Sequence, residues 1–234
     1  MLKYTFRVAL VTVLASFGLN ANAAIVLYDW GYNVDGTFTD TFQFGFGGGD
    51  PAALGVDESN FDDIEGTGTV GMTFNTAGAH NFIMFVDHEI TEGSNGFINE
   101  TVTPNGTAAA GQSYEGDEPG FLFGDIVFNV EDNLLDNSVL GFADDASMAL
   151  GWNFTLAAGE VAEITMHLAA ALPNVLPGFY LAHSDAAAAD VIYFWSTLSI
   201  TGPGPDPMPV PAPAVIGLLM LGLLSAAGRR HIAH

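Results

Sequence analysis

Apolar residues recur at every second position in several segments between residue 24 and residue 201. In one such segment Met148, Leu150 and Trp152 alternate with small or polar residues. Successive side chains of a β-strand point to opposite faces, so this period predicts strands with one buried face rather than helices. About ten strands are expected, at Ile25–Trp30, Phe42–Phe46, Val70–Asn75, Asn81–Ile90, Phe97–Val102, Phe121–Val130, Met148–Leu156, Ala162–Leu168, Gly178–His183 and Val191–Ile200.

Turn-forming residues gather between these segments, as in the Gly-Gly-Gly-Asp-Pro run at 47–51. Short strands joined by such turns predict one all-β domain over residues 24–201, an antiparallel β-sandwich of jelly-roll-like type. The sequence has no repeat of fixed period, which disfavours a β-solenoid. Helix is expected only as short pieces at Asp57–Asp63 and Asp185–Asp190, and the pattern of Asp132–Leu140 is compatible with several structures.

Acidic and basic residues are segregated along the chain. It has 27 Asp and Glu residues against 4 Lys and Arg residues. The basic residues are Lys3, Arg7, Arg229 and Arg230, and every acid lies between Arg7 and Arg229. A domain without these cations cannot neutralise phosphates, which excludes nucleic acid as a partner. The absence of cysteine excludes disulfides, a cysteine nucleophile and a thiolate metal site.

The N-terminus has the pattern of a secretory signal peptide over residues 1–23. Two basic residues precede an uncharged, largely apolar run at 8–19, and Ala21 and Ala23 form a small-residue A-x-A cleavage site. This order predicts export and a mature chain that begins at residue 24. A retained N-terminal anchor is the alternative, which the shortness of the apolar run disfavours.

The C-terminus predicts a rigid spacer and a membrane segment. Every second residue from Pro203 to Pro213 is proline, which prevents sheet and helix and favours an extended linker over residues 202–213. Residues 214–228 contain no charge and are followed by two arginines in the basic tail 229–234. We expect a short transmembrane helix with its tail in the cytoplasm. A helix buried in the domain is the alternative, and the rigid spacer disfavours it.

A proline motif, an apolar segment and a terminal arginine pair, in that order, resemble the PEP-CTERM sorting signal, also called the ice-binding protein C-terminal domain. The family motif has glutamate where this chain has Ala212. The resemblance implies a Gram-negative bacterium that makes exopolysaccharide, and cleavage by a membrane protease of the exosortase type. The matching residues are Val210, Pro211, Ala212, Pro213, the run Val215–Ala227, Arg229 and Arg230.

Three internal segments are also similar to parts of secreted proteins that carry this signal. They are Tyr28–Thr37, Phe85–Ile90 and Ala108–Ser113. This second resemblance implies no particular activity.

The acidic residues predict a site for a hard cation such as Ca²⁺. Asp87 and Glu89 lie two apart on an expected strand and so share one face, whereas His88 between them faces the other way. No EF-hand loop is present in the sequence, and a solvated acidic surface is the alternative. The expected Ca²⁺ ligands are Asp87, Glu89, Glu92, Asn95, Asn99 and Glu100.

These patterns together favour an exported, non-enzymatic protein of the cell surface or the exopolysaccharide matrix. It would be anchored transiently in the inner membrane and then passed outward. A Ca²⁺-dependent carbohydrate-binding module is the alternative, and a secreted hydrolase that uses paired carboxylates is a weaker one. The aromatic residues considered for sugar stacking are Tyr28, Trp30, Tyr32, Tyr114, Tyr180 and Trp195.

Overall fold

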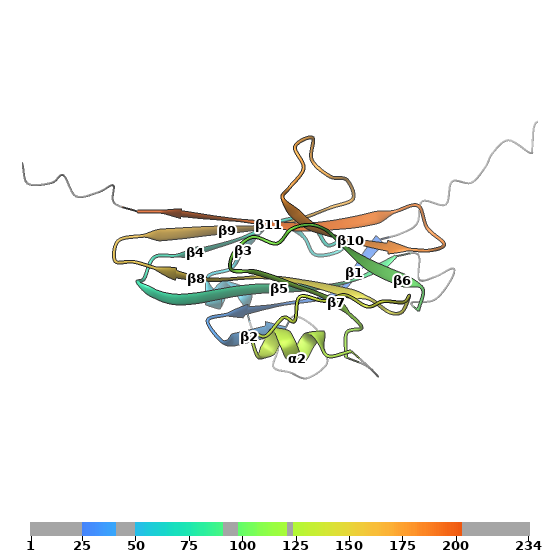
Figure 1. The fold of residues 1–234 in the computed structure, drawn as a ribbon, viewed down its shortest axis with the longest axis horizontal. Helices are drawn as coiled ribbons and strands as arrows, with labels where there is room; N and C mark the ends of the chain where they lie inside the picture. Colours follow the sequence, from blue (N-terminus) through green and yellow to red (C-terminus); the bar gives the residue numbers. More distant parts are fainter. Residues whose placement is uncertain (1–24, 41–49, 91–97, 121–123, 203–234) are drawn as a thin grey trace, which may run out of the picture. The chain divides into compact units, whose positions relative to one another are not determined.

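The computed structural model describes residues 25–40, 50–90, 98–120 and 124–202. Two antiparallel sheets lie face to face as a β-sandwich (Figure 1). The all-β antiparallel sandwich expected from the sequence is therefore confirmed, while the expected linker and membrane helix lie outside the described residues.

The first sheet has five strands, and its strand order is β2-β1-β5-β8-β7. In that order the strands are β2 (Thr37–Asp40), β1 (Ile25–Val34), β5 (Gly78–Ile90), β8 (Ser147–Leu156) and β7 (Gln112–Asp117).

The second sheet has six strands in the order β3-β4-β9-β11-β10-β6. They are β3 (Asp57–Asp62), β4 (Thr67–Phe74), β9 (Val161–Ala169), β11 (Val191–Thr201), β10 (Phe179–Asp185) and β6 (Glu100–Gly106). A short 3-10 helix, η1 (Pro51–Leu54), precedes β3, and one α-helix, α2 (Ile126–Glu131), follows β7.

The main core lies between the two sheets and uses alternate residues of each strand, as the period of two predicts. From β5 it takes Phe82, Met84 and Val86, and from β8 it takes Met148 and Leu150. All five are fully buried, so the strand pair β5–β8 forms the centre of the inner face of the first sheet.

A second, smaller core covers the outer face of the first sheet, which is the face turned away from the second sheet. There α2 lies against the first sheet (Figure 1). Ile126 and Val130 of α2 pack in one cluster with Ile83 and Phe85 of β5. Strand β5 is therefore buried on both faces. The strand predicted at Phe121–Val130 is wrong for its second half, because residues four apart on a helix cover one apolar patch and this packing overrides β-propensity.

Other local predictions also fail. Most of Asp57–Asp63, expected as a helical piece, is instead the exposed edge strand β3, and residues 186–187 form a turn instead of a helix. Strands β2 and β7 were not expected because they are short and polar. Each depends on pairing with a long apolar neighbour, β1 or β8, which local sequence does not reveal.

Two imidazoles lie fully buried between the sheets. His88 faces inward from β5, as its position between Asp87 and Glu89 predicts, and its Nε2 lies 3.0 Å from the carbonyl oxygen of Gly66. The His183 Nε2 lies 2.9 Å from Glu100 Oε2. Burial lowers the pKa of His88 to about 3 and that of His183 to about 4, so both rings are neutral near pH 7.

The close contact between His88 and Gly66 gives a test of the packing at this end of the sandwich. Gly66 has φ +65°, and a Cβ on it would collide with the His88 ring. Gly36 is a matched control, because its φ is +80° but nothing lies within 4 Å of its added Cβ. Gly36→Ala should cost about 1–2 kcal/mol of the free energy of unfolding. Gly66→Ala should cost about 1–3 kcal/mol more. Urea denaturation that gives equal losses for both variants would contradict this packing.

The turn between β1 and β2 forms an ion pair with His80 of β5 at the surface. Asp35 and Gly36 have φ of 49° and 80°, as the tight turn between these strands requires. The His80 Nδ1 lies 2.9 Å from Asp35 Oδ2, and its Nε2 lies 2.9 Å from the Thr76 carbonyl oxygen. Burial lowers the pKa of His80, but these two acceptors raise it more, since only the imidazolium donates from both nitrogens.

This ion pair makes stability depend on pH in a known direction. A histidine whose pKa is raised by folding stabilises the fold below its unfolded pKa of about 6.5, and this contribution disappears as pH rises through the folded value. Asp35→Asn retains a residue suited to the turn but removes the charge. It should cost about 0.3–1 kcal/mol at pH 5.5 and less at pH 8.5. Equal losses at the two pH values, measured by urea denaturation, would rule out the ion pair.

Candidate metal centre

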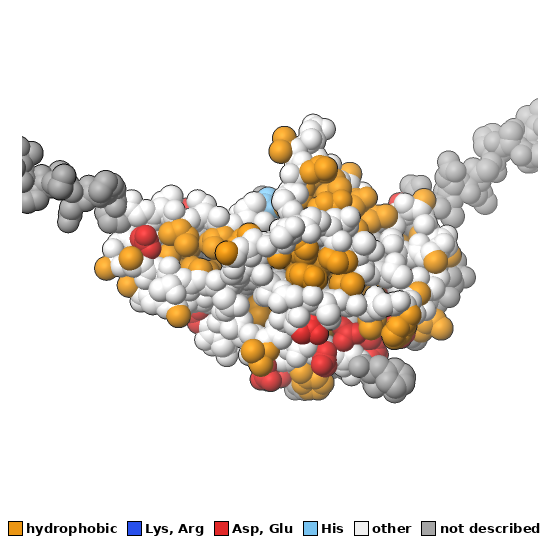
Figure 2. Space-filling model, in the orientation of Figure 1, with side chains coloured by type: hydrophobic (Ala, Val, Ile, Leu, Met, Phe, Trp, Pro, Cys, Tyr) orange, Lys and Arg blue, Asp and Glu red, His pale blue; other side chains and the backbone are white. Residues whose placement is uncertain are grey.

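Acidic side chains gather on the outer face of the first sheet, beyond the small core under α2. Asp87 and Glu89 follow Ile83 and Phe85 at alternate positions of β5, so all four point outward. Figure 2 shows Asp and Glu side chains grouped where Figure 1 places β7 and α2. The sequence has no Lys or Arg between residues 25 and 202, so neither type of side chain can neutralise these acids within the sandwich.

A β-bulge brings a further carboxylate into this group. Leu27 pairs with His88, but the register then shifts and Asp29 pairs with Asp87. A bulged residue, here Tyr28, reverses the alternation of the side chains that follow it. Leu27 therefore faces the core, whereas Asp29 lies on the outer face directly opposite Asp87.

Three carboxylates of this face converge on one point. One oxygen each from Asp87, Glu89 and Asp145 lie within 4.8 Å of one another. Asp87 and Glu89 come from β5, and Asp145 precedes β8, which pairs with β5. Two adjacent chain segments thus fix the positions of all three groups.

Asp87 and Glu89 are buried and Asp145 is partly buried, although residues 25–202 contain no Lys or Arg. Asp87 is 3% exposed, and its Oδ1 has no hydrogen-bond partner among the described residues. Burial, together with the charges of Asp145, Glu89, Glu100 and Asp29, raises the pKa of Asp87 well above its ordinary value. Burial also raises the pKa of Asp29 to about 8, with a hydrogen bond and charge from Asp40 adding to the effect.

A second acidic group lies on and near β7, where Glu115, Asp117 and Asp125 also bring oxygens within 4.8 Å of one another. Here the protein supplies donors. The Asn129 amide donates to Glu115 Oε1 at 2.9 Å and the Asp136 N–H to Oε2 at 3.1 Å. Burial still raises the pKa of Glu115 to about 7. Both oxygens of Asp117 accept backbone N–H groups as well, so these carboxylates order the helix and the adjoining loops.

Of the metal ligands predicted from the sequence, only Asp87 and Glu89 belong to the converging group. Glu92 and Asn95 lie outside the described residues. The Asn99 amide donates to Asp185 at 3.5 Å. Asp145 is the third member of the converging group, and Asp29 lies opposite Asp87 on the neighbouring strand; neither was among the predicted ligands.

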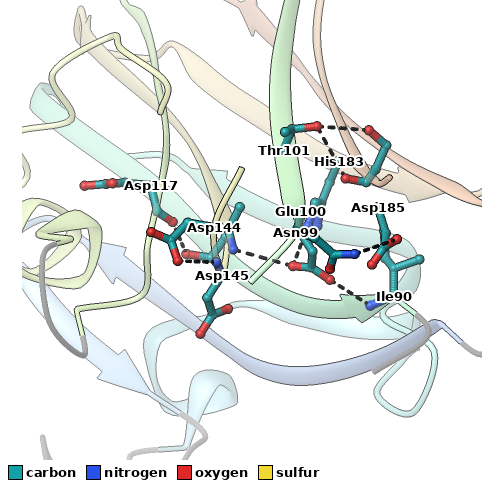
Figure 3. A network of polar contacts seen from close by, with 12 residues as sticks. Ile90, Asn99, Glu100, Thr101, Asp117, Asp144, Asp145, His183 and Asp185 are labelled. Carbon is teal, nitrogen blue, oxygen red and sulfur yellow. Dashed lines mark hydrogen bonds and ion pairs between the residues drawn. The ribbon is translucent and has the colours of Figure 1, made fainter. Parts of the chain in front are cut away.

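Glu100, the remaining predicted ligand, has a structural role at the end of the sandwich. It is 1% exposed, and its Oε1 accepts the Ile90 N–H at 2.9 Å while its Oε2 contacts His183 (Figure 3). Its backbone exchanges two hydrogen bonds with Asp144, the residue before Asp145. Glu100 therefore links β5, β6 and β10 to the segment that carries Asp145.

The aromatic residues singled out from the sequence differ widely in exposure. Tyr32 is fully buried, and both it and the half-buried Trp30 donate to Glu58. Tyr28 is 45% exposed. Tyr114 is half-buried and packs against Phe179.

Tyr180 and Trp195 lie on the outer face of the second sheet, half-buried. Trp195 stacks on His167, with ring centroids 5.0 Å apart and planes within 4° of parallel. Tyr180 meets Tyr193 edge to face at 5.9 Å. These four rings form an aromatic platform on that face.

A cleft of about 420 Å³ opens between the edge strands β6 and β7. Its lining includes Gln112, Tyr114, Asn137 and Phe179, and none of the residues that line it is charged. The Gln112 amide donates to Ser196. The cleft therefore lacks the pair of carboxyl groups that hydrolysis of a glycosidic bond requires.

Comparison with known proteins gives no relative. No family model, curated protein or solved structure matches this chain. Within the part of the chain that the structure describes, no helix has the length and apolar character of a membrane span. The predicted sorting motif (Val210–Pro213, Arg229 and Arg230) and cleavage site (Ala21 and Ala23) lie outside the described residues.

Proposed function

We propose that this chain is an exported, non-enzymatic protein of the cell surface or extracellular matrix, delivered by its C-terminal segment. One observation carries the proposal, which is the segregation of charge. All four basic residues flank the two terminal apolar runs, and every acid lies between Arg7 and Arg229. Basic residues beside apolar runs direct membrane insertion and its orientation, whereas an acidic domain free of cations suits an exported cargo.

The end of the sandwich supports this separation between an exported domain and a C-terminal sorting segment. Strand β11 ends at Thr201, two residues before the first proline of the spacer. Every residue of the two described hydrophobic cores precedes that point. The chain also divides into the units Met1–Thr201 and Gly202–His234. The last described strand thus ends where the proline spacer begins, as expected if the C-terminal segment is a separate sorting segment.

A non-enzymatic role agrees with the placement of the acids. Glycoside hydrolysis needs two carboxyl groups about 5–10 Å apart in a cleft that admits the substrate. Asp87 and Glu89 are instead buried on a sheet face, and the lining of the β6–β7 cleft is uncharged. In the proposed route, an exosortase-like protease processes the chain at the inner membrane and passes it towards exopolysaccharide.

Fractionation of the native bacterium tests the route. Replacing Pro211 and Pro213 together by alanine, or Arg229 and Arg230 by glutamine, should leave uncleaved precursor in the inner-membrane fraction. Replacing Pro203 and Pro205 by alanine is the matched control, because it changes the same spacer outside the motif. A motif variant that is processed and located like the wild type would contradict the sorting role.

The aromatic platform favours a second candidate function, Ca²⁺-dependent binding of a carbohydrate. Sugar rings stack on flat aromatic faces, and Trp195 and Tyr180 are half-buried on a sheet face rather than in the core. Exopolysaccharide would be the corresponding ligand class in the proposed location.

A glycan array, read with CaCl₂ and with EGTA, tests this candidate. We expect binding to at least one polysaccharide, and a loss of affinity of about five- to tenfold in Trp195→Ala, since one good stacking contact contributes about 1–1.5 kcal/mol. Tyr28→Ala is the control, because it removes an exposed ring from the other sheet. An array without binding in either condition would remove the carbohydrate-binding hypothesis.

A further inference from the structure

We propose that Asp87, Glu89 and Asp145 form a binding site for one Ca²⁺ ion on the outer face of the first sheet, with Asp29 beside it. This site does not depend on the proposed route of export. It differs from the site expected from the sequence, because the third carboxylate comes from the segment before β8 and not from the residues that follow β5.

The spacing of the three carboxylates suits this ion. Oxygen ligands lie 2.3–2.6 Å from Ca²⁺, so two ligands of one ion are separated by at most about 5 Å. One oxygen from each of Asp87, Glu89 and Asp145 meets that limit, since all three lie within 4.8 Å of one another. Ca²⁺ takes six to eight oxygens, so water and the second oxygens of these groups would complete the shell.

An independent observation separates this group from an ordinary acidic cluster. Asp87 is only 3% exposed, which means that it is more than nine-tenths buried. Its Oδ1 has no hydrogen-bond partner in the part of the chain that the structure describes. A buried carboxylate without a donor or a cation is costly. Glu100 and Glu115, which are equally buried, each accept hydrogen bonds on both oxygens.

A bound cation neutralises the buried carboxylate of Asp87 better than a proton does. A protonated carboxyl group needs an acceptor for its O–H, and Asp29 and Asp40 have this arrangement because they hydrogen-bond to each other. Among the described residues, Asp87 Oδ1 has no hydrogen-bond partner, and the charged groups that raise the pKa of Asp87 are all acidic. A divalent ion would neutralise several of these groups at once.

The chemical type of the ligand atoms determines which ion the site prefers. The converging ligands are carboxylate oxygens, and the nearest histidine in sequence, His88, faces the opposite side of the sheet. Oxygen ligands favour Ca²⁺ or Mg²⁺ over Zn²⁺. Mg²⁺ demands near-octahedral geometry at 2.0–2.1 Å and usually retains several waters, so a group of three converging carboxylates, two of them buried, favours Ca²⁺.

Thermal unfolding of the purified full-length chain in detergent tests the site. After removal of metal with EGTA and exchange into metal-free buffer, 1 mM CaCl₂ should raise Tm by about 5 °C or more. Calorimetric titration should give one ion per chain. MgCl₂ at the same concentration and NaCl at the same ionic strength should each give less than half of that rise. Equal effects of CaCl₂ and NaCl would show charge screening alone and would overturn the proposal.

Matched variants locate the ion. Asp87→Asn should abolish the Ca²⁺-dependent rise, while its metal-free Tm should equal or exceed that of the wild type because a buried charge is removed. Asp63→Asn makes the same change at an exposed site and should respond like the wild type. If Asp87→Asn does not fold, Asp145→Asn takes its place. Retention of the full rise in the variant, or its loss only in Glu115→Gln, would overturn the assignment. Fractionation of the tail variants is unaffected by either result.

Discussion

The structure depends on how a sandwich without lysine or arginine accommodates buried carboxylates. An isolated buried charge costs several kcal/mol, so each group needs donors, a proton or a cation. Glu100 uses backbone amides and a histidine, Glu115 uses an asparagine and a backbone amide, and Asp29 uses a second carboxyl group. Asp87 Oδ1 has no hydrogen-bond partner among the described residues, and the charges around Asp87 are acidic, so the proposed Ca²⁺ ion would both fill this position and neutralise the group.

The two faces of β5 explain why this site lies where it does. The inner face forms the centre of the main core, and the outer face is covered by α2 along Ile83 and Phe85. Past that helix the same outer face continues into Asp87 and Glu89, which remain buried. One strand therefore joins the hydrophobic support to the acidic group, so the positions of its carboxylates are fixed by the packing of the core.

Local sequence was sufficient for some of this arrangement. The alternation along Asn81–Ile90 predicts both the strand and the shared face of Asp87 and Glu89. It cannot identify Asp145, because that contact arises from the pairing of β5 with β8, about 60 residues apart in sequence. Nor can it identify Asp29, because only the bulge after Leu27 turns that side chain to the outer face. Helix α2 was missed for a related reason, since its apolar residues are β-branched or aromatic and become helical only by packing on the sheet.

The most direct test of the central claim is a crystal structure of the Ca²⁺-loaded protein with anomalous scattering data. We expect one strong anomalous peak on the outer face of the first sheet, with oxygens of Asp87, Glu89 and Asp145 at 2.3–2.6 Å from the ion. A structure in which Asp87 accepts hydrogen bonds from protein donors, with no peak beside it at saturating Ca²⁺, would contradict the account.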